Sequence, residues 1–102
     1  MGYDCVMIEV RETPTFTRWF GKLRDRNARS RIDVRIYRLS LGNPGDVKSV
    51  GKGVSEMRIR YGPGYRIYFC ERGREVVILL AGGDKSSQSR DIRTAQELAE
   101  QV

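Results

Sequence analysis

Residues 54–85 read VSEMRIRYGPGYRIYFCERGREVVILLAGGDK, and this stretch has the clearest strand pattern in the chain. Apolar and polar side chains alternate on both sides of the glycine-proline-glycine turn at 62–64, as in the two antiparallel strands of a hairpin. Residues 76–81 are apolar without alternation, which indicates a central strand buried on both faces. The stretch therefore predicts three consecutive strands that end at Gly82 and Gly83.

The alternation also assigns side chains to the two faces of the hairpin. Ile59 is expected to pair with Ile67, and Arg58 with Tyr68, because cross-strand neighbours share a face. One face is then apolar core, and the other is a surface of arginine and tyrosine. Guanidinium groups held on a sheet favour an anionic ligand in a fixed position.

The segments before this stretch read as one strand followed by two helices. The strand is expected over residues 5–10. Thr13 and Pro14 suit the N-cap and the first position of a helix that runs to about residue 24. A second helix is expected over residues 28–41, because its apolar residues recur at helical spacing.

A short strand over residues 46–50 and a last helix complete the order. Asp84 or Ser86 can cap that helix. The coarse order is thus strand, helix, helix, four strands and helix. It predicts a single α+β domain over residues 1–102, with the helices packed on a small, twisted, antiparallel-rich sheet.

The charge of the chain favours a polyanionic partner. Its 19 lysines and arginines against 13 acidic residues give a formal net charge of +6. A merely solvated surface is the alternative explanation for such an excess. The longest apolar stretch, residues 76–81, is too short to span a bilayer, which takes about 20 residues. We therefore expect a cytoplasmic protein without a membrane partner.

The chain has two cysteines, Cys5 and Cys70, and no histidine. This composition provides neither a zinc site nor a Ser-His or Cys-His nucleophile pair. We therefore expect no metal and no cofactor, and free thiols in a reducing compartment. If the protein is an enzyme, its cations fit metal-free RNA cleavage, in which a ribose 2′-OH attacks the adjacent phosphate.

Basic side chains of the sheet can converge near the start of the last helix. Arg58, Arg66 and Tyr68 share one face, and Lys85 follows the last strand. A helix N-terminus beside Lys85 would add N–H donors for a phosphate. Further contacts to RNA are expected from other basic residues, of which the two on the second helix are secondary: Lys48, Lys52, Arg60, Arg35 and Arg38.

The chain resembles a known protein family. The order of elements and the segments YRIYF at 65–69 and GGDKS at 82–86 are similar to those of the RelE/ParE toxin superfamily, especially its HigB-like, phage-type branch of addiction module killer proteins. The resemblance covers essentially the whole chain. It implies a RelE-like fold and a type II toxin that cleaves mRNA on the ribosome. It also implies a cognate antitoxin, of the helix-turn-helix, HigA-like kind for this branch.

The resemblance assigns roles to three basic residues. Arg66, in the tyrosine-arginine pair of its strand, matches a catalytic cation of RelE-like nucleases. Lys85 matches a basic residue just after the last strand, and Arg58 roughly matches one on the preceding strand. The strand alternation independently places these three cations, together with Tyr68, at one site.

The general base is not fixed by the resemblance, because this chain lacks the tyrosine or histidine that many relatives carry near the start of the final helix or at the C-terminal end. The candidates are Lys52, Glu56, Tyr68 and Asp91, with Tyr68 and Lys52 ahead on position. Two other functions share the fold: a ParE-like inhibitor of DNA gyrase that is not an enzyme, and an inactive module that binds RNA or an antitoxin.

Overall fold

The computed structural model describes residues 8–102. The elements, in chain order, are β1 (Glu9–Glu12), α1 (Pro14–Gly21), α2 (Arg26–Ser40), β2 (Val47–Ser49), β3 (Val54–Ile59), β4 (Tyr65–Arg72), β5 (Val76–Gly83), the short 3-10 helix η1 (Lys85–Ser87) and α3 (Gln88–Gln101). The five strands form one sheet in the order β1-β5-β4-β3-β2. β1 runs parallel to β5, and the other neighbours are antiparallel. The α+β architecture is thus as predicted.

Side-chain caps set where the first two helices begin. The Thr13 hydroxyl accepts a hydrogen bond from the N–H of Phe16 at 3.1 Å, and Pro14 opens α1 as expected. The Asp25 carboxylate accepts bonds from the N–H groups of Asn27 and Ala28. This cap explains why α2 begins at 26, two residues before the predicted start. The predicted first strand lies partly outside the described residues, and β1 extends beyond it to Glu12.

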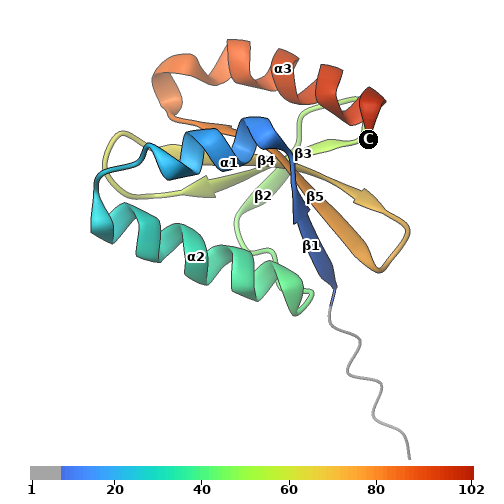
Figure 1. The fold of residues 1–102 in the computed structure, drawn as a ribbon, viewed down its shortest axis with the longest axis horizontal. Coiled ribbons are helices and arrows are strands. Elements are labelled where there is room, and N and C mark those ends of the chain that lie inside the picture. The colour runs from blue at the N-terminus through green and yellow to red at the C-terminus, as the bar shows by residue number, and fades with distance from the viewer. Residues whose placement is uncertain (1–7) are drawn as a thin grey trace, which may run out of the picture.

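The sheet has a hydrophobic core on each face. α1 and α2 cover one face, where Phe16 and Ile32 pack with Leu79 and other strand residues. α3 covers the opposite face, where Ala95 and Ala99 pack with Leu80 and its neighbours. In Figure 1, α3 and α2 accordingly lie on opposite sides of the sheet. β5 contributes to both cores, which confirms the prediction of a central strand buried on both faces.

The pairing of β3 with β4 differs from the prediction by two residues. Arg58 pairs with Arg66 rather than with Tyr68, and Ile59 pairs with Tyr65. The chain leaves the sheet after Ile59, and the two glycines of the turn adopt positive φ values, so the connection is longer than the expected turn. Because the shift is an even number of residues, each side chain keeps its predicted face.

The structure places Cys70 in β4 as a buried free thiol, and burial raises the pKa of that thiol. Cys5 lies outside the described residues. None of the helices within residues 8–102 is long and apolar enough to cross a membrane.

Gly82 allows α1 to lie close against the sheet, and its replacement tests that packing. A Cβ atom at Gly82 would clash with the indole ring of Trp19. We expect Gly82→Ala to lower the free energy of unfolding by about 1–3 kcal/mol, because a ring in a packed core has little room to move. The measurement is a urea titration of both proteins.

Gly21→Ala is the matched control for this prediction. Gly21 has no atom within 4 Å of the position of an added Cβ, and it lies in α1 without a positive φ. Alanine there is expected to leave stability unchanged or to raise it by about 0.5–1 kcal/mol. Equal midpoints for Gly82→Ala and the wild-type protein would contradict the close packing of α1.

Candidate anion-binding site

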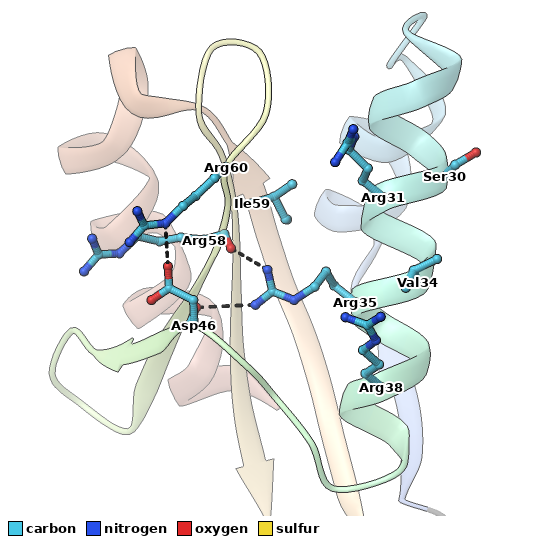
Figure 2. Close-up of a pocket in the computed structure, with 9 residues that line it drawn as sticks. All are labelled: Ser30, Arg31, Val34, Arg35, Arg38, Asp46, Arg58, Ile59 and Arg60. Atoms are coloured by element: carbon cyan, nitrogen blue, oxygen red, sulfur yellow. Dashed lines mark hydrogen bonds and ion pairs between the residues drawn. The ribbon is translucent and has the colours of Figure 1, made fainter.

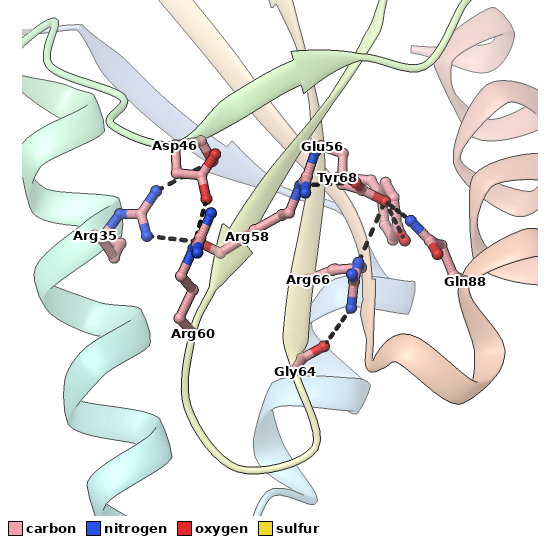
Figure 3. A network of polar contacts seen from close by, with 9 residues as sticks. All are labelled: Arg35, Asp46, Glu56, Arg58, Arg60, Gly64, Arg66, Tyr68 and Gln88. Atoms are coloured by element: carbon pink, nitrogen blue, oxygen red, sulfur yellow. Dashed lines mark hydrogen bonds and ion pairs between the residues drawn. The ribbon is translucent and has the colours of Figure 1, made fainter.

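A buried carboxylate on β3 lies between two arginines. Glu56 is fully buried, its Oε1 lies 3.6 Å from Nε of Arg58, and its Oε2 lies 3.6 Å from Nε of Arg66 (Figure 3). The side chains of Arg58 and Arg66 are 35% and 11% exposed. Like charges directly opposite each other on two strands repel, and these arginines are direct partners. Glu56 offsets that repulsion from the same face of the sheet.

Glu56 also accepts hydrogen bonds from β4 and from α3. The hydroxyl of Tyr68 donates to Oε2 at 3.1 Å, and Nε2 of Gln88 donates to the same oxygen at 2.9 Å. Within the described residues, Oε1 of Glu56 and Nε of both arginines are buried and have no hydrogen-bond partner. These atoms all belong to the two ion pairs of Glu56 with the arginines, at 3.6 Å, so the cluster is held by charge as well as by hydrogen bonds.

The β3–β4 turn brings Lys85 to the same cluster. Nη1 of Arg66 donates to the carbonyl of Gly64 at 2.7 Å, which fixes the direction of the guanidinium. A Cβ atom added at Gly64 would lie 3.2 Å from Nη1 of Arg66 and 3.6 Å from Cβ of Lys85. The N–H of Lys85 donates to the carbonyl of Pro63. Arg66 and the base of the Lys85 side chain therefore both lie against the β3–β4 turn.

A concave surface at this end of the hairpin can hold a small anionic group. It has a volume of about 220 Å³, and its lining includes Arg58, Arg60 and Arg66 together with Gly64 and Tyr65. Arginine presents donors in a planar fork that matches the oxygens of a phosphate. The arrangement can bind a phosphate and stabilise additional negative charge that develops on it.

Tyr68 lies on the predicted face, but that face is not a free surface at this position. α3 covers it, the residue is fully buried, and its ring belongs to the core on the α3 side. The predicted surface of arginine and tyrosine is therefore, at Tyr68, part of a core rather than an exposed face. Burial, together with the charge of Glu56, raises the pKa of Tyr68 above its ordinary value of 10.0.

The raised pKa of Tyr68 leads to a prediction for alkaline solutions. The unfolded chain loses this phenolic proton from about pH 10, whereas the folded protein keeps it, so the free energy of unfolding should fall as the pH rises above that value. Tyr68→Phe should weaken this fall. The variant should also be about 1.5–3 kcal/mol less stable at neutral pH, because a hydrogen bond to a charged group is lost.

Urea titrations of the two proteins at neutral pH and above pH 10 measure both effects. Tyr37 carries an exposed phenol on α2 and provides the control variant, Tyr37→Phe. An identical alkaline slope for Tyr68→Phe and the wild-type protein would show that the phenol of Tyr68 ionises in the folded state.

Three of the other predicted basic residues are exposed and form no salt bridge within the described residues. Lys48 is on β2, and Lys52 is in the β2–β3 turn at the far end of β3, with a φ of 56°. Arg38 is exposed on α2. Lys48 is the direct partner of Glu56 across the β2–β3 pair, so it lies on the same face of the sheet as the paired arginines. Lys52, beyond the start of β3, and Arg38, on α2, lie apart from Glu56.

Arg35 and Arg60 have partners of their own within the fold. Arg35 reaches from α2 and donates to the carbonyls of Arg58 at 2.6 Å and Pro44 at 3.0 Å. Arg60 follows the end of β3 and pairs with the Asp46 carboxylate at 3.3 Å. The role of Arg35 in joining α2 to the sheet had no signal in the sequence.

Among the four candidate bases, Glu56 is the one that contacts both arginines. Asp91 accepts a hydrogen bond from the hydroxyl of Ser87 and packs against Gly83 on α3's side of the sheet. Sequence reasoning did not identify Gln88 as a partner of Glu56. The ion pair of Glu56 with Arg58, by contrast, follows from the sequence, since residues two apart on a strand share a face.

The molecule has the RelE-like fold. It superposes on a mutant of the E. coli toxin RelE in the free state with a TM-score of 0.72 and 14% sequence identity, over 91% of this chain and 97% of that one. Residues 18–101 match the family described as Phage derived protein Gp49-like (DUF891), and the chain belongs to this family. An uncharacterized protein of Haemophilus influenzae (strain Rd) is 46% identical over 95 residues, which cover 93% of this chain and 96% of that protein.

Proposed function

We propose that this protein is the toxin of a toxin-antitoxin system and that it cleaves mRNA without a metal ion. The observation that carries the proposal is the pair of facing arginines, Arg58 and Arg66, around the buried carboxylate of Glu56 beside Lys85. The fold shared with a solved toxin and the membership of the Gp49-like family support the toxin assignment.

The cluster contains the groups that cleavage by a ribose 2′-OH needs. The 2′-oxygen forms a bond to phosphorus, the bond from phosphorus to the 5′-oxygen breaks, and the products are a 2′,3′-cyclic phosphate and a 5′-hydroxyl. Arg58 and Arg66 stabilise the charge that develops on the phosphorane. Lys85 carries an ammonium group that can protonate the departing 5′-oxygen.

Glu56 is the base that this geometry favours. It lies between the two arginines that would hold the scissile phosphate, and because its carboxylate is fully buried, the RNA must displace part of the cluster to reach Oε1. Binding of the phosphate gives both guanidiniums a second anion and leaves Oε1 to accept the proton of the 2′-OH. Tyr68 is disfavoured as a base, because its buried phenol keeps its proton at neutral pH.

The proposal also includes the branch of the superfamily, the compartment, the substrate and the partner. We place the protein in the HigB-like branch, acting in the cytoplasm on mRNA bound to the ribosome, with a helix-turn-helix antitoxin as its partner. The formal charge of +6 supports an affinity for ribosomal RNA that falls steeply with added salt.

Mapping of mRNA 5′ ends in a cell-free translation reaction tests the proposal. We expect new 5′ ends within codons when ribosomes are present, and none in a reaction that contains the same mRNA and protein without ribosomes. Intact message with continued translation would refute the endonuclease, and a DNA gyrase supercoiling assay would then test the ParE-like alternative.

A further inference from the structure

Helix α2 exposes a stripe of large apolar side chains. Val34, Tyr37 and Leu41 are 47%, 60% and 53% exposed, and within residues 8–102 the only other exposed large hydrophobic residue is Val102. The three positions follow the spacing i, i+3, i+7, so they lie along one side of the helix. Single exposed apolar residues are common, but three in one helical stripe indicate a surface that binds another molecule.

A groove runs beside this stripe, between α2 and the end of β3. Its volume is about 470 Å³, and its lining combines the apolar Val34 and Ile59 with five arginines and a single acidic residue, Asp46 (Figure 2). Figure 2 shows Arg31 and Arg38 on the side of α2 that faces the groove. The groove is therefore lined by both apolar and positively charged side chains.

The five arginines of the groove differ in their interaction partners. Arg31 lies over the ring of Tyr61, 4.6 Å from its centroid, and Arg60 pairs with Asp46. Arg38 is exposed and has no salt bridge within the described residues. Glu56 and Asp46 offset two of the five positive charges, those of Arg58 and Arg60, so the groove keeps a net positive charge that an acidic occupant would complement.

We infer that α2 and this groove form the docking surface for an acidic amphipathic helix of a protein partner, which, on the proposed function, is the antitoxin. The apolar face of the partner helix covers Val34, Tyr37 and Leu41, and its carboxylates face Arg31 and Arg38. An RNA strand fits this surface less well. Val34 and Leu41 are aliphatic, so they cannot stack on bases as aromatic side chains do, nor can they contact phosphates.

The position of the groove links docking to the candidate anion-binding site. Arg58 and Arg60 line both the groove and the smaller concave surface that contains Arg66. A helix bound along α2 therefore covers part of the arginine cluster, so the same surface that binds the antitoxin would reduce access of RNA to Arg58.

Binding of a designed peptide to the full chain tests this inference. The probe is a labelled helical peptide with leucines at i, i+3 and i+7 and glutamates on both flanks, and its control has the same composition with the leucines spread around the helix. We expect Val34→Ser/Leu41→Ser and Arg38→Glu each to raise the Kd of the probe about tenfold or more. Arg74→Glu, an equal charge change in the exposed β4–β5 turn, should leave the Kd nearly unchanged.

The outcomes separate the inference from its alternatives. Two results together would show an RNA-binding surface and overturn the inference. A single-stranded RNA oligonucleotide would compete with the probe, and the Kd of the peptide would be unchanged in Val34→Ser/Leu41→Ser. Absence of saturable binding, or equal binding of the control peptide, would also overturn it. Circular dichroism checks that each variant is folded.

The same variants test this inference separately from the proposed nuclease activity. Val34→Ser/Leu41→Ser should cleave mRNA at the wild-type rate, because neither residue belongs to the arginine cluster. If the wild-type protein leaves mRNA intact while the peptide results hold, the nuclease proposal fails and the docking surface stands.

Discussion

Arg66→Ala is expected to reduce the rate of mRNA cleavage roughly 100- to 1,000-fold, the loss found when one preorganised donor to a charged transition state is removed. Arg66 is suited to that role because its side chain is 11% exposed and its guanidinium is already oriented by Glu56 and by the Gly64 carbonyl. The rate of appearance of new mRNA 5′ ends, with ribosomes in excess, measures the effect. Arg66→Lys should also be strongly impaired, since an ammonium group cannot present two parallel donors.

Arg74→Ala is the matched control for charge, because Arg74 is exposed in the β4–β5 turn, at the other end of β4. It should cleave at the wild-type rate. Arg66→Ala should remain folded, since Glu56 keeps Arg58, Tyr68 and Gln88 as partners. A folded Arg66→Ala protein that cleaves as fast as Arg74→Ala would remove Arg66 from the mechanism.

Glu56→Ala is expected to lower the free energy of unfolding by about 3–5 kcal/mol, the usual cost of removing one partner from a buried ion pair. The substitution leaves two facing arginines without a carboxylate between them. It also leaves the buried hydroxyl of Tyr68 without its acceptor. Urea titrations of the variant and the wild-type protein measure the difference.

An added anion provides a specific test of this explanation. Inorganic phosphate should stabilise Glu56→Ala more than it stabilises the wild-type protein, because a phosphate can take the position of the missing carboxylate between the arginines. Glu71→Ala, at an exposed position on β4, is the control and should change stability little. If Glu56→Ala matches Glu71→Ala in stability, Glu56 does not hold the arginines together.

Much of the fold could be predicted because both the alternation of apolar residues in the strands and their helical spacing in the helices are strong in this sequence. The apolar run of β5 required a strand covered on both faces, and Thr13 with Pro14 fixed the start of α1. The β3–β4 register could not be predicted, because it depends on where the chain leaves the sheet rather than on the alternation. Gly62 and Gly64, both with positive φ, allow a connection longer than the pattern suggests.

The positions of the basic residues in the candidate site could be predicted, but the residues that surround them could not. Alternation placed Arg58 and Arg66 on one face, and the strand end placed Lys85 nearby. Nothing in the local pattern indicated that α3 would cover Tyr68 or that Gln88 would reach Glu56. Those contacts depend on the direction in which α3 crosses the sheet, and that direction is set by tertiary packing.

The parallel pair β1–β5 affects when the protein can assemble during its synthesis. The hydroxyl of Thr13 donates to the carbonyl of Leu80, 67 residues later in the chain. Contacts between residues so far apart form slowly, whereas the hairpins β3–β4 and β4–β5 are local. β1 and α1 can therefore pack on β5 only after β5 has left the ribosome. Gln88, which follows β5 in the chain, reaches Glu56 later still. On the proposed function, a nascent chain stays harmless to the ribosome that makes it until its translation is nearly complete.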